Sequence, residues 1–264
     1  MTTIITIIFF VFGLIIGSFL NVVILRLNTQ KSFSGRSKCM ACQNQLCWYE
    51  LVPIISFFVL KGRCKSCKTK ISIQYPLVEL LTAIIFACLF LKFQNVFYYS
   101  GTLVFAGTMA FYAAMFSLLI VIAVYDIRHK IIPDVLTLVF AALAFIGLFF
   151  FSGYGFNLHI PSIWELLSGV FIAIPFALIW LFSKGTWMGL GDAKLSLGLG
   201  WLLGLSRALS GIVLAFWSGA IIGLLLIALS KKHSMKSEIP FAPFLVLGAI
   251  LAFLFELHLF PLGF

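Results

Sequence analysis

Long apolar runs separated by short polar segments extend along almost the whole chain. A helix that spans a bilayer needs about 20 mostly apolar residues, and eight runs approach this length. Their expected bounds are 4–25, 76–93, 102–125, 133–151, 164–183, 188–205, 208–230 and 241–262. The pattern predicts an all-α polytopic membrane protein with about eight transmembrane helices.

Composition supports this class and excludes a large soluble domain. Of the 264 residues, 62% are hydrophobic and 10% are charged, whereas a soluble domain carries about 25% charged residues. Too few polar side chains remain to cover a soluble core. The first run follows no basic segment, and no small-residue cleavage site is evident before Asn21. We therefore expect this run to be a retained span and not a removed signal peptide.

The positive charge is concentrated in a few loops. The net charge is +10, from 18 Lys/Arg against 8 Asp/Glu. In a soluble protein this excess would indicate nucleic-acid binding, but in a membrane protein the positive-inside rule explains it, and no nucleic-acid partner is expected. If loop 26–75 is cytoplasmic, every Lys and Arg except Lys92 and Arg207 lies inside. This predicts a multi-pass protein of the cytoplasmic membrane with its N-terminus outside.

Three parts follow from this arrangement: a first transmembrane helix over 1–25, a cytoplasmic loop over 26–75, and a transmembrane domain over 76–264. The loop contains two Cys-x-x-Cys pairs, which are separated by 21 residues. Each pair can offer two thiolates from one tight turn to a tetrahedral zinc ion. The predicted ligands are Cys39, Cys42, Cys64 and Cys67.

The other possibilities for these thiols are a pair of disulfides, which a cytoplasmic location disfavours, and four free thiols. A structural zinc ion would supply folding free energy to a loop with few apolar residues. Cys47 lies outside the pattern and is an additional thiol that can compete as a ligand. Cys88 lies inside a predicted span, where a cysteine packs as a small apolar residue.

Two acids interrupt the apolar pattern. Asp126 follows the uncharged run 102–125, and Asp192 follows Gly189 and Gly191 at the start of another run. Carboxylates at membrane depth are costly and are usually retained for function. Both lie at the predicted cytoplasmic face, so the sequence predicts a pair of aspartates that act together. The two glycines can let an extended substrate backbone approach the second carboxylate.

Two further acids have less definite roles. Asp134 follows Pro133, and we expect it to be a first-turn acid that interacts favourably with a helix dipole. Glu79 lies near the cytoplasmic edge of the second span. It is either a similar first-turn or snorkelling acid, or a polar group that faces a ligand from the loop.

The order of these motifs resembles that of the type IV prepilin peptidases, a family of GxGD aspartic proteases that are often also N-methyltransferases. The matching segments are GSFLNVVILR (17–26), the two Cys-x-x-Cys pairs, YPLVEL (75–80), the Asp-x6-Pro element from Asp126 to Pro133, the GxGD element that ends at Asp192, and IPFAPFL (239–245). The resemblance covers nearly the whole chain. Departures from the family pattern are Asn28, Arg128 and Ala242, and both aspartates themselves match the pattern.

The resemblance implies an enzyme that cleaves the leader of prepilins or pseudopilins on the cytoplasmic side, after a glycine. Asp126 and Asp192 would be its catalytic residues, and the four cysteines its zinc ligands. It also implies N-methylation of the new N-terminus with S-adenosylmethionine as donor and the first cytoplasmic loop involved. No residues for that cofactor are assigned, and Glu79 is a candidate. The expected partners are prepilin substrates and the lipid bilayer.

Two interpretations from other classes compete with this one. An ion- or proton-coupled transporter could use the two aspartates to bind a cation, although its acids should then lie near the midplane of broken helices. A membrane-tethered zinc module that docks a partner would explain the cysteines and the charge. It would leave the eight runs and both aspartates unexplained.

Overall fold

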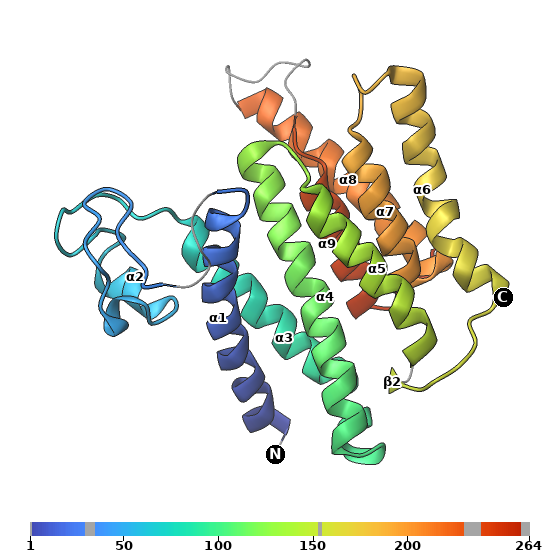
Figure 1. Cartoon of the computed structure of the whole chain (residues 1–264), viewed down its shortest axis with the longest axis horizontal. Coiled ribbons are helices and arrows are strands. Elements are labelled where there is room, and N and C mark those ends of the chain that lie inside the picture. The colour runs from blue at the N-terminus through green and yellow to red at the C-terminus, as the bar shows by residue number, and fades with distance from the viewer. Residues whose placement is uncertain (1, 30–34, 153–154, 230–238, 260–264) are drawn as a thin grey trace. The chain divides into compact units, whose positions relative to one another are not determined.

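The computed structural model describes residues 2–29, 35–152, 155–229 and 239–259. Each of the eight predicted spans is a helix in this part of the chain (Figure 1). The helices are α1 (Thr2–Arg26), α3 (Gln74–Tyr99), α4 (Thr102–His129), α5 (Asp134–Phe150), α6 (Ile163–Ser183), α7 (Leu190–Leu203), α8 (Leu205–Leu229) and α9 (Ala242–Leu254). The predicted all-α membrane class is confirmed.

The eight helices differ in length. By length and composition, α1, α3, α4, α6 and α8 can each cross a membrane. The other three, α5, α7 and α9, are shorter than about 20 residues, and each ends earlier than its predicted bound. Helix α7 lies between Gly189 and Gly204, and the positive φ of 75° at Gly204 ends it. Helix α9 ends at Leu254, because Glu256 adopts a left-handed conformation two residues later.

Small elements complete the described part of the chain. A 3₁₀ turn (Trp48–Glu50) and a short helix α2 (Ile55–Val59) lie in the loop between the first two spans. Strands β1 (Phe151–Ser152) and β2 (Gly155–Phe156) form a short antiparallel hairpin that the sequence pattern did not predict. The Phe156 N–H donates to the Thr108 hydroxyl over 3.0 Å, which attaches the hairpin to α4.

The structure divides into two compact units, residues 1–94 and residues 95–264. In the first unit α1 packs closely against α3, and glycine permits this contact. A Cβ atom on Gly13 would lie 2.6 Å from the Ala83 Cα, and one on Gly17 would lie 2.7 Å from the Glu79 Cα. Close approach of this kind is typical of membrane helices, which pack through small residues because lipid supplies no hydrophobic drive between them.

Small residues also join the helices of the second unit. Helices α6 and α7 lie side by side (Figure 1), and a Cβ atom on Gly200 would lie 2.6 Å from the Gly169 Cα. The Ser168 hydroxyl donates to the Gly200 carbonyl over 3.0 Å, and the Trp201 indole donates to the Leu166 carbonyl over 2.9 Å. This contact fixes α7, which carries Asp192.

We predict that Gly200→Leu destabilises the protein, because no side chain fits between α6 and α7. Overpacking of this kind costs about 1–3 kcal/mol or more, which corresponds to several degrees in Tm. Thermal unfolding in detergent measures the effect. Gly107→Leu in α4 is the control, since a Cβ atom there meets nothing within 4 Å. Equal shifts in both variants would contradict the packing argument.

Candidate functional site

Asp126 lies in the last full turn of α4. The helix continues to His129 and ends at Lys130, whose φ is 54°. Asp126 is therefore within the helix, which continues past the predicted bound at residue 125. Its side chain is 4% exposed, and its Oδ2 atom accepts a hydrogen bond from the Ala242 N–H over 3.2 Å. This amide belongs to the first residue of α9.

Asp192 lies in the first turn of α7. Gly189 is the N-cap of this helix, and its carbonyl accepts a hydrogen bond from the Asp192 N–H over 3.3 Å. The side chain is 7% exposed, and its Oδ1 atom is buried with no hydrogen-bond partner among the described residues. A buried carboxylate oxygen without a donor is costly, and such an atom usually indicates a missing ligand, water or proton.

The structure brings the two predicted aspartates together inside the second unit. Asp126 lies close enough to Asp192 for the two carboxylates to repel each other when both are charged. Like charges at short range cannot both be ionised without a large cost, so such a pair tends to share one proton. The arrangement suits general acid–base chemistry, in which one carboxyl group gives a proton and the other takes one.

The two glycines of the GxGD element have different surroundings. A Cβ atom on Gly191 would lie 2.8 Å from the Ile132 Cβ, so Gly191 is required for packing. A Cβ atom on Gly189 would meet only its own turn, at 3.9 Å from the Asp192 Oδ2. The space beside Gly189 is therefore open towards the carboxylate, whereas the Ile132 side chain fills the space beside Gly191.

Asp134 is a first-turn acid of α5, as predicted. Its Oδ1 atom also accepts a hydrogen bond from the Lys194 ammonium over 2.7 Å. Both side chains are largely exposed, so the pair contributes at most about 1 kcal/mol to stability. The Lys194 ammonium is therefore directed to Asp134.

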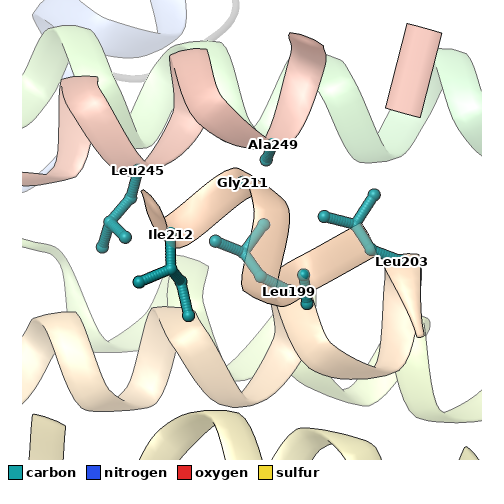
Figure 2. Close-up of a pocket in the computed structure, with 7 residues that line it drawn as sticks. Leu199, Leu203, Gly211, Ile212, Leu245 and Ala249 are labelled. Carbon is teal, nitrogen blue, oxygen red and sulfur yellow. The ribbon is translucent and has the colours of Figure 1, made fainter. Parts of the chain in front are cut away.

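One pocket of the second unit is small and apolar. It lies between α7, α8 and α9 and is lined by residues such as Leu199, Ile212 and Leu245 (Figure 2). None of the predicted catalytic or metal-binding residues lines it. It has no polar group that could bind or activate a substrate.

The four predicted metal ligands gather at one point in the first unit. The sulfur atoms of Cys39, Cys42, Cys64 and Cys67 all lie within 4.8 Å of one another. The Cys39 Sγ and the Cys67 Sγ are 3.7 Å apart. A tetrahedral zinc site with Zn–S bonds of about 2.3 Å has sulfur atoms about 3.8 Å apart, whereas a disulfide bond is about 2.05 Å long. The cluster can hold a metal ion.

Both Cys-x-x-Cys turns have the same backbone structure. The Cys39 N–H donates to the Asn44 carbonyl and the Cys64 N–H donates to the Thr69 carbonyl, each over 2.9 Å. In the first turn Lys38 pairs with Gln45 in an isolated antiparallel bridge, and in the second turn Arg63 pairs with Lys70 in the same way. The two turns are therefore repeats of one local fold that present their thiols to each other. Cys47 is exposed and lies outside the cluster.

Local hydrogen bonds favour thiolates at two of the ligands. Hydrogen bonds with the Thr69 hydroxyl and backbone lower the pKa of Cys67 to about 6. Backbone hydrogen bonds with Cys42 and Ala41 lower the pKa of Cys39. The pKa of Cys42 rises to about 11: its backbone hydrogen bond with Asn44 lowers it, but desolvation and the neighbouring cysteines outweigh that bond. Four thiolates at this distance require a cation between them.

Glu79 lies in the second turn of α3 and is buried. The interpretation as a first-turn or snorkelling acid is therefore wrong. Its Oε2 atom accepts a hydrogen bond from the Ile54 N–H over 2.7 Å, and the Ser18 side chain also bonds to it. Glu79 thus joins both membrane helices of the first unit to the segment between the two Cys-x-x-Cys turns.

Sequence reasoning did not assign two backbone groups of these sites. The Ala242 N–H holds Asp126, and the Ile54 N–H holds Glu79. In the sequence, the segment IPFAPFL (239–245) contributes only to the family resemblance, and the structure places one of its amides on Asp126. No sequence signal distinguished Ile54.

Comparison with known proteins gives matches over most of the chain. Residues 11–93 match the family described as the bacterial peptidase A24 N-terminal domain, and residues 113–224 match the type IV leader peptidase family. No solved structure matches.

Several curated proteins are similar along their length. A prepilin leader peptidase/N-methyltransferase of Bacillus subtilis is 33% identical over 94% of this chain and 93% of its own length. One from Xanthomonas campestris is 32% identical over 91% of this chain and 88% of its own length. One from Myxococcus xanthus is 34% identical over 87% of this chain, and the match spans 65% of that relative.

We predict that the purified protein contains about one metal ion per chain, because the four sulfur atoms lie at the spacing of a tetrahedral site. Elemental analysis of wild type and Cys64→Ser tests this. The variant should lose most of the metal and unfold at a lower temperature, since metal binding stabilises such a loop. Cys88→Ser in α3 is the control and should keep the metal. Equal metal content in both variants would exclude the cluster.

Proposed function

Because the chain belongs to the type IV leader peptidase family, we propose that it removes the leader from prepilins or pseudopilins by hydrolysis with Asp126 and Asp192. The observation that carries this proposal is the pair of buried carboxylates that α4 and α7 bring together. The cut lies after a glycine that precedes the hydrophobic segment of the substrate. In this arrangement residues 76–264 are the peptidase part.

One shared proton is sufficient for the reaction. The Ala242 N–H is placed to hold negative charge on Asp126, so this carboxylate takes a proton from the attacking water. Asp192 carries the shared proton and gives it to the scissile carbonyl oxygen. This oxygen would lie beside the Asp192 Oδ1 atom, which has no hydrogen-bond partner among the described residues. The tetrahedral intermediate then collapses, a proton passes to the leaving nitrogen, and the C–N bond breaks. The products are a leader with a free carboxyl group and a mature chain with a free amine.

The site lies at the cytoplasmic face, with the N-terminus of the chain outside. The Lys and Arg distribution supports this orientation through the positive-inside rule. The basic leader of a substrate would then stay in the cytoplasm while its apolar segment lies among the helices. A cut at this boundary needs carboxylates near the ends of the spans, where Asp126 and Asp192 are found.

Residues 26–75 form the metal-binding loop, and we assign zinc to its four cysteines as a structural ion. The sulfur–sulfur distance of 3.7 Å and the repeated turns support this assignment. A second activity, N-methylation of the new amine, follows from the names of the relatives. S-adenosylmethionine would supply the methyl group. The unit of residues 1–94 is the part we assign to this step.

We predict that Asp126→Asn and Asp192→Asn each lower the rate of prepilin cleavage at least about 100-fold, because neither carboxylate can act as both acid and base. Mass spectrometry of a co-expressed prepilin gives the extent of cleavage and the mass of the mature N-terminus. Asp134→Asn is the control. It removes an exposed acid that pairs with Lys194, and it should leave cleavage within about twofold of wild type.

Cleavage that persists in either site variant would remove that aspartate from the mechanism. If the wild type cleaves no prepilin while its membrane fold is intact, the transport interpretation of the two aspartates would replace the peptidase.

A further inference from the structure

A polar group is buried between α1 and α3 in the unit of residues 1–94. Asn21 is 1% exposed, and its Nδ2 atom donates to the Tyr75 carbonyl over 3.1 Å and to the Gly17 carbonyl over 3.3 Å. The two carbonyls identify the nitrogen of this amide, because an oxygen in its place would face two acceptors. The Oδ1 atom therefore points to the other side, and it has no donor among the described residues.

A second polar atom at the same end of α3 is also without a partner. The Nε2 atom of Gln74 is buried and has no acceptor among the described residues. Gln74 directly precedes Tyr75, whose carbonyl binds Asn21. A buried acceptor on α1 and a buried donor on α3 are thus left unpaired, and Asn21 is bonded to the residue next to Gln74. Each costs stability unless something else completes its hydrogen bonds.

Glu79 places a carboxylate next to this group. It lies one turn after Tyr75, and its Cα packs against Gly17, one turn before Asn21 on α1. In the described part of the chain its polar contacts are the Ile54 N–H and the Ser18 side chain, and no lysine or arginine pairs with it. A buried carboxylate without a cation is a costly arrangement that favours binding of a positively charged group.

The backbone is strained at Ile54, the residue whose N–H binds Glu79. Ile54 has a φ of 61° and a ψ of −52°. A β-branched residue rarely adopts a positive φ, and such residues gather at functional sites. The loop holds this conformation at the point where the Ile54 N–H reaches Glu79, between the two Cys-x-x-Cys turns.

We propose that Glu79, Asn21 and Gln74 form a binding site for an α-amino group that neighbours a carbonyl group. The ammonium would donate to the Glu79 carboxylate and the Asn21 Oδ1, and the adjacent carbonyl oxygen would accept from the Gln74 Nε2. This inference rests on the proposed methyl transfer, because two of its reactants carry this chemistry. They are the mature N-terminus released by cleavage and the amino-acid part of S-adenosylmethionine.

Direct binding to the purified full-length protein tests the site. Isothermal titration would use S-adenosylmethionine and, separately, a synthetic peptide with the N-terminal sequence of a mature pilin. Glu79→Gln keeps an oxygen that can accept from the Ile54 N–H but removes the charge. We expect this variant to raise the Kd of one of the two ligands at least about tenfold, because a charged hydrogen-bond partner is lost. The ligand that weakens identifies which reactant the site binds.

Glu50→Gln is the matched control. Glu50 also accepts a backbone hydrogen bond at 2.7 Å, from the Cys47 N–H, but it is outside the buried group. The same loss of charge there should change both affinities less than about twofold. An N-terminally acetylated peptide should bind Glu79→Gln and wild type equally if the amine is what Glu79 recognises.

Gln74→Met provides a second variant that breaks no hydrogen bond of the described residues. If the unpaired Nε2 serves a ligand, this variant should bind the same ligand more weakly while its Tm is unchanged or higher. A lower Tm with unchanged affinity would mean that the group is structural, and it would overturn the inference. So would a Glu79→Gln variant that binds both ligands as wild type does.

The outcome is separable from that of the peptidase. Prepilin cleavage by the wild type is measured on the same preparations. A wild type that cleaves but binds neither ligand would overturn the inference and leave the peptidase intact. A wild type that binds a ligand through Glu79 but does not cleave prepilin would support the binding site and overturn the proposed peptidase.

Discussion

Two carboxylates that repel each other can stay buried together only if the helices that carry them are held in place. This constraint governs the unit of residues 95–264. Helix α7 carries Asp192 and packs on α6 through Gly169 and Gly200, with backbone atoms in direct contact. The indole of Trp201 and the hydroxyl of Ser168 add hydrogen bonds across the same interface. Such contacts hold the two helices at a short distance, because their backbones meet at the two glycines.

The unusual ends of two helices follow from the same constraint. Helix α7 has 14 residues and a length of about 21 Å, less than the roughly 30 Å of a bilayer core. The acid in its first turn, Asp192, is buried among the described residues. Helix α9 begins between two prolines, and its first amide, that of Ala242, points at Asp126. A regular longer helix would have used that amide for its own hydrogen bonds.

The sequence predicted much of the fold because membrane helices are encoded in long apolar runs. All eight runs became helices, and the two Cys-x-x-Cys pairs came together as one cluster. Periodicity could not give the bounds of α7 and α9, since Leu, Phe and Gly continue past their ends. It also missed the β1–β2 hairpin, whose strands have two residues each.

The missing parts of the sites are backbone groups. Ala242 and Ile54 act through N–H groups that every residue except proline possesses, so no residue type marks them. Gly191 shows the related problem for side chains. Its spacing before Asp192 suggested access for a substrate, but only the three-dimensional structure reveals that Ile132 fills the space.

In the unit of residues 1–94, the metal cluster and the buried acid are connected through one segment. The two Cys-x-x-Cys turns hold the ends of the loop, and a metal ion between them would fix the distance across it. The residues between the turns include Ile54, whose strained backbone directs an N–H to Glu79. A positive φ at a β-branched residue persists only where the surroundings determine it strongly. A metal ion would therefore act on Glu79 without touching it: its ligand nearest to Ile54 in sequence would be Cys64, and it would hold the loop in the conformation that presents the Ile54 amide.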